Sequence, residues 1–115
     1  MALSEIEARR VEKAVNAYVQ KRRPPAHIRP ELDIGFRLSG QSVEIFEIRP
    51  AWRRPGEIME HKIAKATFVR TRGVWKVLWQ RADLKWHSYQ PVPTVGSIEK
   101  FLDLVDTDPH CCFWG

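Results

Sequence analysis

Two apolar runs separated by a short turn constrain the fold of this chain most strongly. Apolar side chains alternate with polar residues or glycine over residues 32–38, which is the period of a strand with one buried face. Residues 39–42 (Ser-Gly-Gln-Ser) indicate a turn, and a second apolar run follows at residues 43–48. The sequence therefore predicts a β-hairpin. Because the apolar set changes parity between Ile45 and Phe46, we expect a β-bulge there.

Helical signals lie on both sides of the strand patterns. Ser4 and Glu7 match a capping box, and apolar residues then recur at helical spacing until a Pro-Pro pair forbids continuation. We therefore expect a helix over residues 4–22. A second helix is predicted after the capping residue Ser97, because apolar residues again recur at helical spacing. It should end near residues 106–109.

Three further strands are predicted between the hairpin and the last helix, at residues 61–70, 75–80 and 84–89. The element order is then helix, five strands, helix. Short connections between the strands indicate an antiparallel meander with both helices on one face. The sequence therefore predicts an α+β fold made of one domain, residues 1–115.

The bulk properties narrow the class of protein. No apolar run approaches the roughly 18–20 residues that a membrane helix requires, and the N-terminal residues lack the pattern of a signal peptide. We therefore expect a cytoplasmic protein without membrane contact. Cys111 and Cys112 are adjacent, so a disulfide between them could not link distant parts of the chain. We therefore expect both to be free thiols. The histidines and cysteines lack metal-ligand spacing, so we predict no metal and no cofactor.

Positive charge is concentrated in the middle of the chain. Residues 50–90 carry nine Lys and Arg against three acids, which indicates an anionic partner such as nucleic acid or another polyanion. The alternative is an ordinary solvated surface, which composition alone favours. The predicted binding residues in this region are Arg53, Arg54, Arg70, Arg72, Arg81, Asp83, Lys85, Trp86 and His87.

The segment from Arg81 to His87 is the strongest local feature. Arg81, Asp83, Lys85 and His87 share parity, so in an unbroken strand they would face one side. They could line a binding groove, with His87 as a general base or as an anion ligand when protonated. This gives a further hypothesis, an enzyme with its site at Arg81, Asp83 and His87, although we name no catalytic residue and favour a non-enzymatic binding protein. The alternative, which we favour, is a structural network in which Asp83 bridges its cationic neighbours.

The tryptophans divide into two expected groups. Trp75 and Trp79 share parity with Val77 in a predicted strand, so we expect both in the core. Trp52 and Trp86 remain candidates for exposed rings that stack on bases. Five Trp and five Phe in so short a chain also suggest a self-associating module, so a homodimer is a further hypothesis.

A metal-dependent nuclease is a weaker hypothesis. It would draw on Asp33, Glu44 and Glu47 together with the Glu-His-Lys run at residues 60–62, because such enzymes need acids for Mg²⁺ and a lysine near the phosphate. This spacing arises often by chance, so we do not favour it.

Several longer stretches resemble one bacterial family. They are residues 21–50, residues 64–89 with the pattern WxxxWxRADLKWHxY, and the terminal CFWG. Together they resemble the family known as domain of unknown function 3024, over nearly the whole chain. The resemblance implies neither a reaction nor catalytic residues.

The last residues also resemble the nucleophile motif GCFWG of A-type peptide methionine sulfoxide reductases. The match covers Cys112 to Gly115, but Cys111 replaces the first glycine, and we expect no long domain after the motif such as that family has. Asp106 and Asp108 would raise the thiol pKa, whereas His110 would lower it. We therefore expect Phe113 and Trp114 to anchor this end of the chain on the body.

Overall fold

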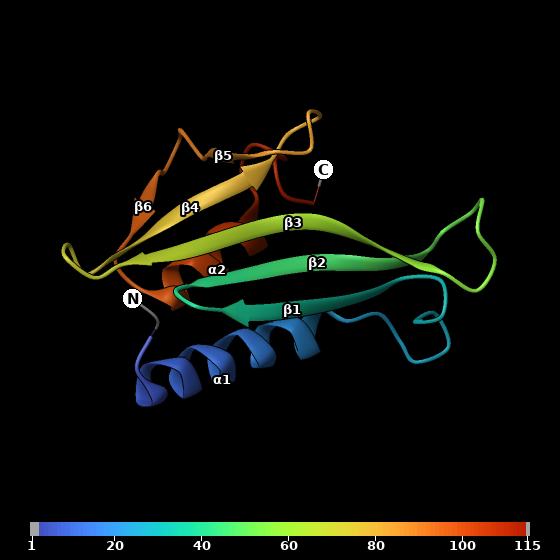
Figure 1. Ribbon diagram of the computed structural model, residues 1–115, viewed down its shortest axis with the longest axis horizontal. Helices are drawn as coiled ribbons and strands as arrows, with labels where there is room; N and C mark the ends of the chain where they lie inside the picture. Colours follow the sequence, from blue (N-terminus) through green and yellow to red (C-terminus); the bar gives the residue numbers. More distant parts are fainter. Residues whose placement is uncertain (1–2, 115) are drawn as a thin grey trace.

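The computed structural model describes residues 3–114 and has an α+β fold (Figure 1). A helix stands at each end of the chain and an antiparallel meander lies between them, as the sequence predicts. The elements are α1 (Glu5–Arg22), β1 (Asp33–Ser39), β2 (Ser42–Pro50), β3 (Ile58–Val69), β4 (Val74–Gln80), β5 (Trp86–Ser88), β6 (Thr94–Val95) and α2 (Ile98–Thr107).

The sheet has the strand order β1-β2-β3-β4-β5, and β6 pairs with β4 beside β5. The predicted bulge is confirmed: Ile45 pairs with Ala64 but Phe46 pairs with Lys62. Ile63 is therefore the extra residue of β3, and both Ile63 and Ala64 are buried. A bulge of this kind increases the local twist of the strand pair.

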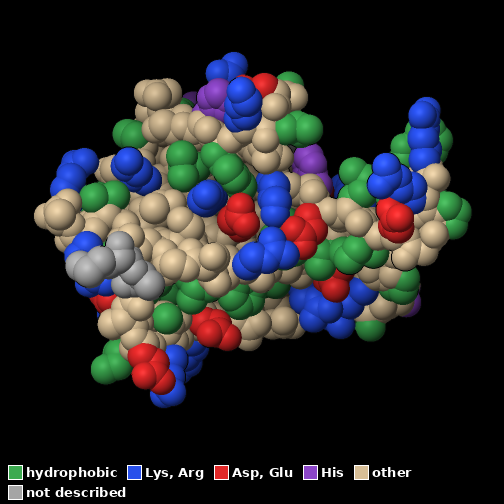
Figure 2. Space-filling view, in the orientation of Figure 1, with side chains coloured by type: hydrophobic (Ala, Val, Ile, Leu, Met, Phe, Trp, Pro, Cys, Tyr) green, Lys and Arg blue, Asp and Glu red, His purple; other side chains and the backbone are tan. Residues whose placement is uncertain are grey.

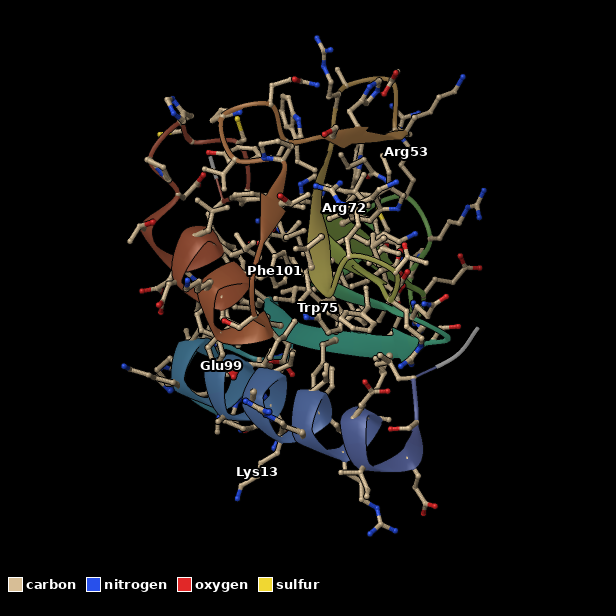
Figure 3. The ribbon with its side chains drawn as sticks, turned by 90° about the vertical axis from the view of Figure 1, so that its left-hand side faces the viewer. Lys13, Arg53, Arg72, Trp75, Glu99 and Phe101 are labelled. Carbon is tan, nitrogen blue, oxygen red and sulfur yellow. The ribbon has the colours of Figure 1, made fainter. Side chains whose placement is uncertain are left out.

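Both helices cover the same face of the sheet, as predicted (Figure 1). The capping box of Ser4 and Glu7 forms at the start of α1, and α2 packs against α1, β3 and β4. Figure 3 shows Trp75 and Phe101 between the sheet and the helices, where they are 6% and 0% exposed. Trp79 is half-buried and packs against the edge of the same core, so the expectation of a core position is confirmed for Trp75 and only in part for Trp79.

Several strand boundaries differ from the prediction. β3 begins at Ile58 rather than at residue 61, because its first residues pair with the end of β2. The fifth strand covers Trp86–Ser88 rather than residues 84–89, because Leu84 adopts φ 61° within a turn. The two-residue strand β6 was not predicted; it is too short to show alternation.

The β2–β3 hairpin extends beyond the rest of the sheet (Figure 1). The last pair of β1 with β2 is Asp33 with Ile48, and pairing of β4 with β3 stops at Lys65. Residues 49–60 therefore form a two-stranded projection closed by a loop, which we call the arm.

The C-terminal segment packs onto the body as the anchor that the sequence predicts. The backbone N–H groups of Phe113 and Trp114 donate to the carboxylate of Asp108, at 3.1 and 2.8 Å. The Trp114 indole donates to the carbonyl of Val105 at 3.0 Å. Phe113 is 5% exposed, and its ring lies 4.9 Å from that of Tyr89. The Phe113 side chain is therefore part of the core, and the Trp114 side chain packs against it.

Candidate nucleic-acid interface

Neither helix covers the second face of the sheet within residues 3–114, and we call this the open face. Directly opposed residues of an antiparallel sheet point to the same side. Lys65 opposes both Glu44 and Leu78, and Lys76 opposes Thr67. These side chains therefore share the open face, whereas Val43 and Ile45 of the alternate positions lie in the core. Figure 2 shows Lys, Arg, Asp and Glu side chains gathered over the middle of this face.

One half of the open face neutralises its own charge. The Arg37 guanidinium donates to both carboxylate oxygens of Glu60, at 3.1 and 2.7 Å. Lys62 lies 3.0 Å from Glu60 and 3.7 Å from Glu44. The hydrogen bond from Arg37, with help from Lys62, lowers the pKa of Glu60 to about 2. Both cations also cover the ring of Phe46, so this network seals an apolar side chain beneath it.

The other half of the open face carries unneutralised charge. No carboxylate within residues 3–114 lies within ion-pairing distance of Lys65 or Lys76. The Lys65 ammonium instead stands 5.7 Å from the centre of the Trp86 ring. Trp86 is half-buried rather than fully exposed. We call Lys65, Lys76 and Trp86 the lysine–tryptophan surface.

The structure separates the nine predicted binding residues into three groups. Arg53 and Arg54 lie in the loop of the arm, and Arg72 lies in the exposed β3–β4 turn at the other end of β3. Arg70, at the end of β3, is held by Glu7 of α1 at 2.9 Å. That hydrogen bond is the largest cause that lowers the pKa of Glu7 to about 2. Arg70 therefore links the sheet to α1.

The third group occupies the β4–β5 turn, and here one expectation is wrong. Residues 81–85 do not continue a strand, so Arg81, Asp83, Lys85 and His87 do not share one strand face. The Leu84 N–H donates to the Arg81 carbonyl at 2.8 Å, which closes the turn. A turn reverses the chain, and parity no longer predicts side-chain direction within it.

Asp83 nevertheless organises this turn, as the structural alternative anticipated, although through other partners. One of its carboxylate oxygens accepts from the Lys85 backbone N–H at 3.0 Å, and the other lies 2.8 Å from Nε2 of His87. The backbone hydrogen bond, followed by the one from His87, lowers the pKa of Asp83. The Arg81 guanidinium lies 5.6 Å from the Trp79 ring.

A hollow of about 190 Å³ lies beside His87, lined also by Arg81, Tyr89 and Cys112. Burial raises the pKa of the Cys112 thiol, and Asp108 and Cys111 raise it further. This thiol is therefore held in its protonated form at neutral pH, which is the less nucleophilic form. The Tyr89 hydroxyl is buried and has no hydrogen-bond partner among the described residues.

The acids of the nuclease hypothesis are each engaged by a neighbouring cation. Asp33 binds Arg23 through two hydrogen bonds of 2.8 and 2.7 Å, and Glu47 binds Arg49 at 3.0 Å. Glu44 and Glu60 belong to the network of the open face described above. Over residues 3–114, no three His, Cys, Asp or Glu side chains are grouped to hold a metal ion.

Sequence analysis singled out Trp86 as a candidate binding residue, but not Lys65. Lys65 and Trp86 are far apart in the sequence and meet only across strand β4. Parity within a strand shows which of its residues share a face. The proximity of Lys65 and Trp86 could be predicted only from the register between the strands.

The fold and its open face define a small α+β domain with a mixed, partly basic sheet surface. The chain belongs to the family described as a domain of unknown function (DUF3024), whose model matches residues 3–115. This confirms the resemblance seen in the sequence. Neither the curated proteins nor the solved structures contain a match to the chain. No helix within residues 3–114 is long and apolar enough to cross a membrane.

Proposed function

We propose that this protein binds single-stranded nucleic acid on the lysine–tryptophan surface. The observation that carries the proposal is the contact of the Lys65 ammonium with the Trp86 ring, 5.7 Å from its centre, on a sheet face without a helix. A cation beside an aromatic ring supplies the two interactions that single strands use, a phosphate contact and base stacking.

The shape of the surface favours a single strand over a duplex. A duplex is usually read by an element that enters a groove, commonly a helix or a two-stranded ribbon. The strands of the open face instead present side chains side by side, which suits splayed bases along an extended backbone. Lys76 and the exposed Arg72 lie towards the β3–β4 turn, so they extend the cationic track from Lys65 along the sheet.

The proposal predicts a weak, salt-dependent interaction. Phosphate contacts to a single strand give a slope of about −0.7 per contact in a plot of log affinity against log salt. Loss of Lys65 and Lys76 together should therefore flatten the slope by about 1.4.

The test is fluorescence anisotropy with labelled single-stranded DNA, RNA and duplex DNA over a series of salt concentrations. The test variant is Lys65→Ala/Lys76→Ala. The matched control is Lys13→Ala/Lys100→Ala, which removes the same charge from exposed positions on α1 and α2. Figure 3 shows Lys13 directed away from the sheet. Equal binding by the two variants would show that only net charge matters and would remove the proposed surface.

A second candidate function is self-association, because the arm exposes Trp52, Ile58 and Met59 at 81%, 69% and 53%. Isolated exposed apolar residues are ordinary, but a cluster of them commonly marks a contact surface. Sedimentation velocity over a hundredfold range of concentration tests this candidate. A constant monomer mass would exclude it over that range.

A further inference from the structure

We infer that the arm is a second contact for the same nucleic acid, in which the Trp52 ring stacks on an unpaired base. The inference rests on the proposed function, because it assigns a further residue to that strand. Its occupant is a base of single-stranded DNA or RNA together with the adjoining phosphate.

The loop of the arm is held in shape by its own backbone. Ala51 N–H donates to the Glu57 carbonyl at 2.9 Å, Arg54 N–H to Ala51 at 3.1 Å, and Glu57 N–H to Arg54 at 3.0 Å. Gly56 has φ 86°, a conformation that residues with a Cβ rarely adopt. The loop is therefore ordered before any ligand binds, which reduces the entropy lost on binding.

Trp52 is displayed on this loop rather than packed. Its side chain is 81% exposed, although Trp is a residue that folding normally covers. The Arg53 guanidinium lies 4.4 Å from the ring centre and so covers one ring face. At such exposure the opposite ring face remains in water, available to a base.

The surroundings of Trp52 match the chemistry of a nucleotide. A hollow of about 320 Å³ beside the ring is lined also by three apolar residues, two arginines and one glutamate: Ala51, Ile58, Met59, Arg53, Arg54 and Glu57. Its apolar residues suit the face of a base, and of its two arginines only one is paired with the glutamate. Arg53 has no carboxylate partner among the described residues, whereas Arg54 pairs with Glu57 at 3.5 Å. Arg53 is therefore the cation of the arm that a phosphate can engage without displacing an acid.

Strand β3 connects the arm to the lysine–tryptophan surface, and the Arg37–Glu60–Lys62 network of the open face lies between them. Strand β3 runs from Ile58 in the arm to Lys65 on the open face, a span of roughly 23 Å at about 3.3 Å per residue. A single strand lying along β3 would reach both contacts. An oligonucleotide long enough for both should therefore bind more tightly than one that reaches a single contact.

The test measures affinity and stacking separately. The variants are Trp52→Ala and Trp52→Phe, and the matched control is Leu84→Ala, which removes an apolar side chain of 74% exposure from a different turn. Anisotropy gives the affinity for oligonucleotides of about 4 and 16 nucleotides, the range of single-strand sites. Fluorescence of the base analogue 2-aminopurine in the longer strand reports stacking.

We expect Trp52→Ala to weaken binding of the longer strand by about 5- to 150-fold, the loss produced by removing one stacked base. Trp52→Phe should retain most of the affinity, and Leu84→Ala should bind as the native chain does. The quenching of 2-aminopurine should fall in Trp52→Ala. Because Trp52 is exposed, unfolding temperatures should remain unchanged.

Native affinity and quenching in Trp52→Ala would overturn the inference, while loss of binding in Lys65→Ala/Lys76→Ala would still support the proposed function. Absence of binding by every form at low salt would overturn both. A concentration-dependent dimer that disappears in Trp52→Ala, with nucleic-acid binding intact, would assign the arm to self-association instead.

Discussion

The Lys65 ammonium lies 5.7 Å from the centre of the Trp86 ring, and the two residues come from β3 and β5, which β4 separates. The contact therefore spans three strands of the open face. Cation–π contacts of this kind contribute about 0.5–1 kcal/mol at exposed sites, which is too little to define the fold. Its importance is that it places a charge and a ring together where no helix covers them.

The first prediction concerns Trp86. Replacing it with leucine should weaken single-strand binding by about 1–3 kcal/mol, because a stacking surface for one base is lost. Trp86→Phe should restore most of that loss. Anisotropy titrations at one fixed salt concentration measure both, with thermal unfolding as a check that the sheet is intact. Equal affinity of the leucine and phenylalanine variants would mean that Trp86 serves packing alone.

The second prediction concerns acid stability. The pKa of Glu60 is lowered from 4.5 to about 2, mainly by the hydrogen bond from Arg37. A lowered pKa stabilises the fold above the unfolded value, and that contribution is lost as the pH falls from about 4.5 towards about 2. Glu60→Gln should therefore lower stability near pH 7, by about 1 kcal/mol or less.

Urea unfolding at several pH values checks this second prediction. The difference in unfolding free energy between the native chain and Glu60→Gln should shrink as the pH falls through that window. If the difference instead stays constant from pH 7 to pH 2, the charge of the Glu60 carboxylate does not stabilise the fold.

The sequence predicts local features of this fold better than its surfaces. The capping box of Ser4 and Glu7 and the parity change at Ile45 are local signals, and both appear in the structure. The start of β3 at Ile58 was missed because residues 58–60 are exposed on both faces of the strand, so no alternation of buried and exposed residues marks them. Their strand conformation depends on pairing with β2.

The candidate surface depended still more on tertiary context. Trp86 was recognised, but Lys65 was not, because only the register of three strands brings the two together. Conversely, Arg70 was predicted to bind a ligand, and the fold pairs it with Glu7 instead. Charge in a sequence does not show which cations the fold will neutralise.

The third prediction concerns the C-terminal anchor. Phe113 is 5% exposed and packs against the Tyr89 ring in a tilted arrangement, so Phe113→Ala should destabilise the protein by about 3–5 kcal/mol. Chemical unfolding measures the loss of stability in Phe113→Ala. The variant Cys112→Ser, in the same segment, should leave the affinity for nucleic acid unchanged. A loss below about 1 kcal/mol would mean that the anchor contributes little to the core.

The fourth prediction separates binding from catalysis at the β4–β5 turn. His87 opposes Trp79 in the sheet, so its side chain is on the side away from the lysine–tryptophan surface. His87→Ala should therefore leave single-strand affinity within about twofold, within the usual range of ±0.5 kcal/mol for surface substitutions. Asp83→Asn should behave similarly. A large loss of affinity in both variants would move the interface to this turn and would revive the hypothesis of an active site there.

The most direct test of the central claim compares the salt dependence of single-strand binding among three proteins. They are the native chain, Lys65→Ala/Lys76→Ala and Lys13→Ala/Lys100→Ala, and the two variants have the same net charge. The account predicts that the control keeps the native slope, whereas the open-face variant binds more weakly with a slope flatter by about 1.4. Identical slopes and affinities for the two variants would contradict it.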